Sequence, residues 1–234
     1  MHDPLELHVS PFFSRLKTPL CFFALKLLLI GFTLWMIWLD IAVFQTQILE
    51  ISFTEVSQEL LLFACALLFW CAPDKDGRGF NYLADGFFGC LLMRELDGLF
   101  DPISHSAWCA PFLVIAASAL FNGFRKPNRA QTLVQLEAFF SSPIFATMST
   151  GFAILLFSRV FGMGSLWHLV LGEGYERLAK TTVEEGVELL AYSMWFAASI
   201  EYFLRARSAM QLSQSAPVPA AFASGQISPV RRAA

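Results

Sequence analysis

The chain has 234 residues, of which 56% are hydrophobic and only 15% are charged, and its formal net charge is -3. Soluble domains carry about 25% charged residues, so this composition excludes an ordinary soluble globular protein. No basic domain or stripe occurs in the sequence, which excludes general affinity for nucleic acid. Several separate apolar runs of membrane-spanning length predict an all-α, polytopic membrane protein that is surrounded by the lipid bilayer.

In chain order, a cytoplasmic N-terminal segment (1–18) is expected to precede a single domain (19–207) that holds six transmembrane helices. The predicted spans cover residues 19–42, 53–72, 80–100, 107–124, 132–158 and 182–205. The connection between the last two spans is half apolar, so an interfacial and a re-entrant course both remain open for it. Residues 208–234 are rich in Ala, Ser and Pro and are predicted to form a disordered cytoplasmic tail.

The distribution of positive charge predicts how this bundle is oriented. Lys and Arg occur in the N-terminal segment, in the second and fourth loops and after the last span, whereas the first and third loops contain none. By the positive-inside rule, both termini are cytoplasmic and the odd-numbered loops face outward.

The third span ends in the charged stretch "MRELDGLFD" (93–101). Its uninterrupted apolar part, from Phe80 to Met93, has 14 residues. Such a helix reaches about 21 Å, which is short of a hydrocarbon core of about 30 Å. The helix is therefore expected to draw Arg94, Glu95 and Asp97 into the outer part of the membrane.

Helical spacing places three of these charges on one face. If the helix continues to Pro102, then Arg94, Asp97 and Asp101 fall within an arc of about 60°. Because charges that face lipid cost at least about 2.5 kcal/mol each, this face is expected to point into the bundle. His105 follows on the short outer loop.

The last span carries a complementary polar stripe that begins at its outer end. Its members fall within an arc of roughly 100°: Arg177, Thr181, Glu184, Glu185, Glu188, Tyr192 and Ser199. Asp40, at the end of the first span, lies at the same expected depth. The outer half of the protein is therefore predicted to be acidic.

We expect the third and sixth spans to form one outward-facing pocket. Its predicted core is Arg94, Asp97, Asp101, Glu184 and Glu188, with Asp97 and Glu188 as a titrating pair and Arg94 as their tuning charge. A wider set adds Glu95, His105, Glu185, Tyr192 and Asp40. Ionisable side chains inside a membrane indicate function by default, and this pocket favours a proton, a cation or a small cationic solute, for transport or sensing.

Two alternatives remain open. In the first, Asp101, His105, Glu184 and Glu188 bind a divalent metal and activate water, which would make the protein a hydrolase of a lipid or another amphiphile. In the second, the protein is an accessory or assembly subunit of a homo-oligomer or membrane complex, and its ion pairs only lock helices together. Common protease, hydrolase and nucleotide-binding motifs are absent from the sequence.

Two segments carry a resemblance to a known group of proteins. "RELDGLFDPISHSAW" and "VEEGVELLAY" resemble a pair of segments in bacterial inner-membrane proteins of unknown function. The resemblance implies a location in the bacterial inner membrane and implies no activity. Lipid-processing hydrolases of the alkaline ceramidase and adiponectin-receptor kind also place acids and histidines on several helices, but this chain lacks their histidine-rich last helix.

Overall fold

The fold was analysed in a computed structural model, which describes residues 4–46, 52–74, 77–172 and 177–215, with the backbone alone for residues 4–15. The described residues form helices and turns and contain no strand, so the all-α prediction is confirmed. By length and composition, three segments are apolar enough to cross a membrane: Leu16–Val43, Phe53–Cys71 and Pro143–Phe161. A shorter apolar helix covers Cys109–Phe124.

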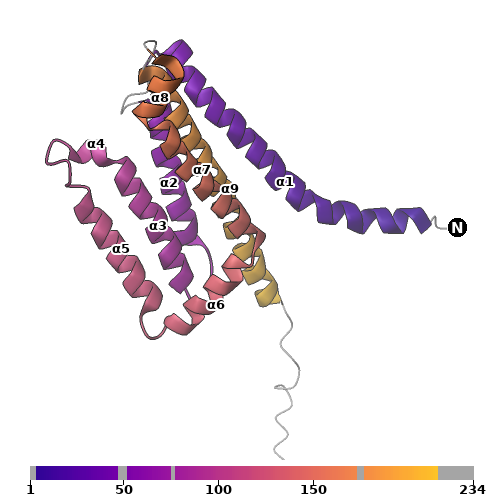
Figure 1. Cartoon of the computed structure of the whole chain (residues 1–234). Helices are drawn as coiled ribbons and strands as arrows, with labels where there is room; N and C mark the ends of the chain where they lie inside the picture. The colour runs from indigo at the N-terminus through magenta and orange to yellow at the C-terminus, as the bar shows by residue number, and fades with distance from the viewer. Residues whose placement is uncertain (1–3, 47–51, 75–76, 173–176, 216–234) are drawn as a thin grey trace, which may run out of the picture.

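The first half of the chain contains four long helices and one short one (Figure 1). They are α1 (Pro4–Trp38), continued by a π-helical turn (Leu39–Val43), α2 (Phe53–Cys71), α3 (Gly79–Glu95), α4 (Asp97–Phe100) and α5 (Cys109–Phe124). The second half contains α6 (Arg129–Phe140), α7 (Pro143–Phe161), α8 (Gly164–Leu171) and α9 (Arg177–Ser215).

The predicted fifth span, 132–158, is divided into α6 and α7. Ser142 has an extended backbone, and its hydroxyl oxygen accepts a hydrogen bond from the Phe145 N–H, which caps the start of α7. Pro143 occupies the first turn, where it needs no hydrogen-bond partner, but it disfavours a helical conformation at Ser142. The break therefore ends α6 at Phe140, and α7 begins as a separate helix.

Two other predicted boundaries also differ. The third predicted span, 80–100, is interrupted at Leu96, where α3 ends and the four-residue α4 begins. The last predicted span, 182–205, lies within the longer α9, which continues to Ser215 through residues predicted to be disordered from 208 onward. Residues 216–234 of the predicted tail lie outside the described residues.

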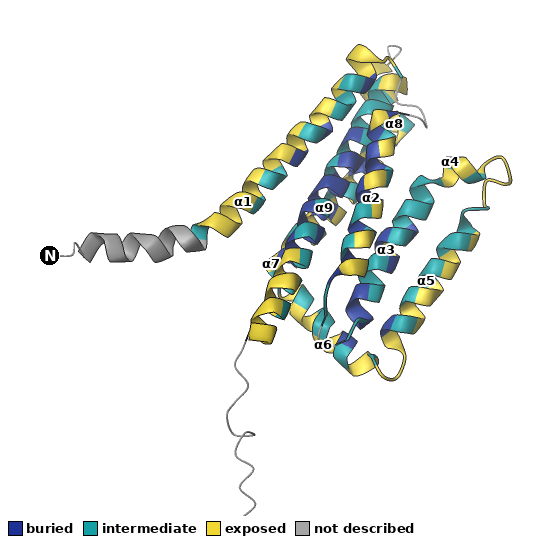
Figure 2. Cartoon of the chain, turned by 180° about the vertical axis from the view of Figure 1, so that it is seen from behind, coloured by how far each residue is buried: buried dark blue, intermediate teal, exposed yellow. Residues whose placement is uncertain are grey.

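Helix α9 is the axis of the molecule. It packs against α1, α2 and α7, while α3 packs against α2 and α5. Figure 2 shows the middle of α9 as the most continuously buried stretch, in agreement with a core that includes Leu189, Tyr192 and Trp195. The Trp195 indole stacks on Tyr192 and donates a 2.8 Å hydrogen bond to the Met148 carbonyl on α7.

Candidate functional site

A polar cavity of about 390 Å³ lies at the end of the bundle where α2 begins and where α3 and α7 end. It is lined by Glu55, Gln58, Glu59, Arg94, Glu95, Leu96, Asp97, Gly98, Leu99, Arg159, Glu185 and Glu188. Asp97 is exposed, whereas Glu188 and Gln58 are buried. The cavity thus leads from an exposed carboxylate to buried polar groups between four helices.

Glu188 joins three of these helices. Its side chain is 3% exposed and contacts the Arg159 guanidinium of α7. The Ser158 hydroxyl donates a 3.2 Å hydrogen bond to Glu188 Oε1, and Arg94 Nη2 of α3 lies 3.7 Å from Glu188 Oε2. A buried carboxylate requires such partners because burying an unpaired charge is very costly.

Glu95 forms a second bridge between α3 and α9. Its Oε1 accepts hydrogen bonds from the Tyr192 hydroxyl and from Arg94 Nη2, each at 2.7 Å. The sequence left open whether these two helices touch, and the hydrogen bond between Tyr192 and Glu95 shows a direct contact between α3 and α9 at this depth.

Gln58 connects α2 to the same site. Its Nε2 donates to the Glu185 carbonyl oxygen at 3.0 Å and to Glu185 Oε2 at 3.1 Å. Because Gln58 is 1% exposed, these two bonds fix the Glu185 carboxylate at the wall of the cavity.

Three of the five predicted core residues line the cavity: Arg94, Asp97 and Glu188. Glu184 lies beside the cavity, with its carboxylate 3.5 Å from Lys180 Nζ and 3.9 Å from Arg159 Nη1. It packs against Gly162, where a Cβ atom would lie 2.3 Å from Glu184 Oε1.

Asp101 does not line the cavity. Its carboxylate is paired with His105 Nδ1 at 2.9 Å, and the His105 side chain is 91% exposed. The predicted common face of Arg94 and Asp101 assumed one continuous helix. The interruption at Leu96 changes the direction of the chain, which leaves Asp101 and His105 on the turn that follows α4.

In the wider predicted set, some residues lie at the cavity and others lie away from it. Glu95 and Glu185 line the cavity, and Tyr192 contacts it through Glu95. Asp40 is fully buried elsewhere, where its carboxylate accepts hydrogen bonds from Thr46 Oγ1, the Phe53 and Thr54 N–H groups and Thr54 Oγ1. Its role is to hold the start of α2.

The four residues suggested as metal ligands do not gather. In the part of the chain that the structure describes, no group of three or more His, Cys, Asp or Glu side chains is placed to hold a metal ion. Asp101 and His105 pair with each other, while the nearest charged partners of Glu184 and Glu188 are Arg and Lys side chains. In the described residues, these four side chains therefore do not form one ligand set.

Arg159 and Gln58 line the site, although neither was predicted to belong to it. Arg159 is one residue beyond the predicted end of the fifth span, so it reads as an ordinary loop charge. Gln58 carries no charge, but it lies between Glu55 and Glu59 on the first turns of α2, and this cluster of polar residues at a helix start is the signal that was available.

The charge of the cavity is unbalanced. Two guanidinium groups, of Arg94 and Arg159, face the carboxylates of Glu55, Glu59, Glu95, Asp97, Glu185 and Glu188. In a partly buried site, this excess of carboxylates attracts a cation or retains protons. Comparisons with protein-family models, curated proteins and solved structures found no match to this chain.

Proposed function

We propose that this chain is a polytopic protein of the bacterial inner membrane with six spans, formed by α1, α2, α3, α5, α7 and α9, and with both termini cytoplasmic. Successive helices of this set run in alternating directions, and α6 is a lateral connection at the end opposite the polar cavity (Figure 1). The proposal is supported by the three long apolar helices and by the positive charge of the second and fourth loops.

The function that the geometry supports best is the binding of a cation or small cationic solute from the outer side, for transport or sensing. The observation that carries it is the cavity of about 390 Å³ with six carboxylates and two guanidinium groups. This volume is at the small end of the usual range for ligand pockets, about 300–1,000 Å³, so the solute is small. Glu188, with its two arginines, would form the inner wall, and Asp97 would meet the entering cation.

Ion pairing in the cavity also favours a second candidate, a purely structural role in an accessory subunit. Arg94 and Arg159 both contact Glu188, so the network joins α3, α7 and α9 without any ligand. The two functions differ in one respect: only a binding site makes the stability of the protein depend on a cation.

The test is thermal unfolding of the purified full chain in nanodiscs, with 1,4-diaminobutane or sodium ion as the probe and potassium glutamate as the ionic-strength control. A ligand that binds only the folded state raises the Tm as its concentration increases. We expect such a rise for at least one probe, and we expect Asp97→Asn and Glu185→Gln to remove it.

Asp101→Asn is the matched control, because Asp101 is a nearby carboxylate that does not line the cavity, and it should keep the wild-type response. If Asp97→Asn and Glu185→Gln each change the Tm by the same amount in the presence and in the absence of a probe, the structural role would be supported. A response that survives in both cavity variants would place the cation elsewhere and overturn the proposal.

A further inference from the structure

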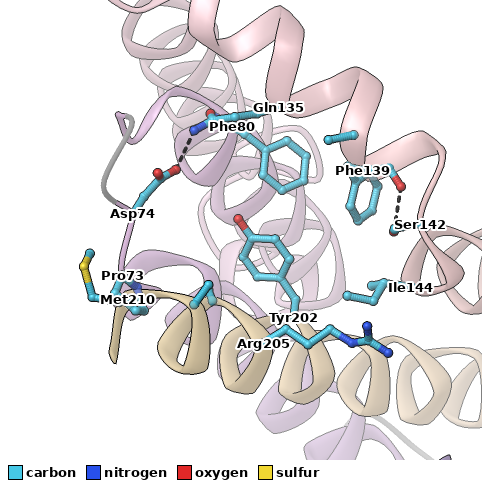
Figure 3. Close-up of a pocket in the computed structure, with 13 residues that line it drawn as sticks. Pro73, Asp74, Phe80, Gln135, Phe139, Ser142, Ile144, Tyr202, Arg205 and Met210 are labelled. Atoms are coloured by element: carbon cyan, nitrogen blue, oxygen red, sulfur yellow. Dashed lines mark hydrogen bonds between the residues drawn. The ribbon is translucent and has the colours of Figure 1, made fainter. Parts of the chain in front are cut away.

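A second cavity, of about 410 Å³, lies at the opposite end of the bundle, and its lining is mostly apolar with a few polar side chains. Its walls come from the α2–α3 connection and from α3, α6, α7 and α9, and its polar members include Asp74, Gln135, Tyr202 and Arg205. Figure 3 shows Tyr202 between Asp74 on one side and Arg205 on the other. The polar cavity of about 390 Å³ at the other end, which we call the outer cation pocket, shares none of these residues.

An apolar crevice of about 490 Å³ continues from this cavity into the bundle. Phe80 and Phe139 line both spaces, so the two are adjoining. Eight phenylalanines line the crevice, and three of its side chains, Phe87, Phe140 and Phe152, are 44–55% exposed. The crevice is therefore open sideways, in the direction that the bilayer would occupy.

The polar end offers one cationic donor to a ligand. Gln135 donates to Asp74 Oδ2 and to the Gly77 carbonyl, and the Tyr202 hydroxyl donates to Asn81 Oδ1, so these side chains are engaged within the protein. Arg205 donates from Nε and Nη2 to Glu201 Oε1, and within the described part of the chain its Nη1 hydrogens have no acceptor.

The surroundings of Arg205 favour an anionic head group. Arg125, Lys126, Arg129 and Arg207 are exposed at this end of the molecule, and among the described residues none of them forms an ion pair. A guanidinium group matches the geometry of phosphate oxygens, to which it donates charge-assisted hydrogen bonds.

We propose that the second cavity and the crevice form one binding site for an anionic phospholipid of the cytoplasmic leaflet. Its phosphate contacts Arg205, and one acyl chain lies among the phenylalanines between α3, α6 and α7. The bilayer is the source of this ligand because the crevice opens sideways through exposed apolar side chains. The inference rests on the proposed membrane location and does not depend on the outer cation pocket.

The test is native mass spectrometry of the detergent-solubilised full chain, titrated with dioleoyl-phosphatidylglycerol or with dioleoylglycerol, which has the same acyl chains but no phosphate. One charge-assisted hydrogen bond predicts about tenfold tighter binding of the anionic lipid. Arg205→Gln should remove this preference, because the charge-assisted hydrogen bond to the phosphate is lost. The acyl chain should still bind, so a weaker adduct should remain. Ser149→Phe, which fills the crevice from α7 without removing any packing side chain, should remove both lipid adducts.

The matched controls are Arg177→Gln, which removes an exposed arginine at the opposite end of α9, and Thr150→Phe, which adds the same ring to α7 outside the crevice. Both should bind lipid as the wild type does. Equal binding of the two lipids by the wild type, or equal adducts in Ser149→Phe and Thr150→Phe, would mean annular lipid only and would overturn the proposal. An adduct with glycerol 3-phosphate alone, at the same affinity, would also overturn it, because the acyl chain would then contribute nothing.

Discussion

Two buried carboxylates are stabilised here in different ways, and the difference separates a structural residue from a site residue. Asp40 is 0% exposed and is surrounded by backbone and hydroxyl donors of its own hairpin. Glu188 faces a cavity and is held by side chains from two other helices, of which Arg159 is half exposed. The sequence shows both simply as acids at the outer ends of spans.

Replacing Asp40 with alanine should destabilise the protein by at least about 2 kcal/mol. The change leaves the buried Thr54 hydroxyl and two N–H groups at the start of α2 without their acceptor, and each buried donor without a partner costs about 1–3 kcal/mol. The measurement is reversible unfolding in mixed micelles with increasing dodecyl sulfate. Asp101→Ala, an exposed carboxylate, should change stability by less than about 0.5 kcal/mol.

Glu188 is expected to be coupled energetically to Arg159. Glu188→Gln should cost about 3 kcal/mol, because it leaves one guanidinium in contact with a neutral amide and weakens a second interaction with Arg94. Once Arg159→Met has removed the partner, the same substitution should cost at least about 1 kcal/mol less. A double-mutant cycle measured by the same unfolding assay gives this coupling directly, and additive single effects would contradict it.

At the scale of helices, most of the fold could be predicted from the sequence, because apolar runs and polar interruptions are local signals. The start of α2 at Phe53 and the end of α5 at Phe124 agree with the predicted limits. The division of the fifth span was also readable, since Ser142 followed by Pro143 is a helix-start signal inside an apolar run. The interruption at Leu96 has no such signal.

Membership of the site was harder to predict than the helices. On one continuous ideal helix, Asp101 would lie on the same face as Arg94. Because α3 ends at Glu95 and a separate helix follows, the two residues no longer share a face. Arg159 belongs to the site because α7 packs against α9, and a single sequence carries no information on which helices are neighbours. Depth alone correctly grouped Glu95, Asp97 and Glu188, because residues at one level of a bundle are near one another when their helices touch.

The contact between α3 and α5 depends on small residues and offers a test of helix packing. A Cβ atom on Gly86 would lie 2.3 Å from Ala119 Cβ, so Gly86→Ala forces the two helices apart. We expect a loss of about 1–3 kcal/mol in unfolding free energy, as for other overpacked cores. Gly31→Ala on α1 is the control, since a Cβ there meets nothing within 4 Å and should not destabilise the protein.

At the scale of the whole molecule, the two ends of α9 differ in chemistry. One end contributes Glu185 and Glu188 to a cavity with excess carboxylates, and the other contributes Arg205 at the end where the exposed basic residues gather. In a membrane protein this polarity fits an acidic outer side and a basic cytoplasmic side. Both proposals depend on this orientation of the chain in the membrane, and the orientation can be measured directly.

Orientation can be tested by labelling single cysteines in intact cells with a membrane-impermeant maleimide, after the five native cysteines have been replaced. Ser104 and Leu169 lie near the acidic end and Pro127 at the basic end, and all three are exposed, so only the membrane should decide their access to the reagent. We expect labelling of Ser104→Cys and Leu169→Cys in intact cells and labelling of Pro127→Cys only after the cells are opened. The reverse pattern would turn the acidic cavity toward the cytoplasm, and labelling of all three in intact cells would contradict the six-span arrangement.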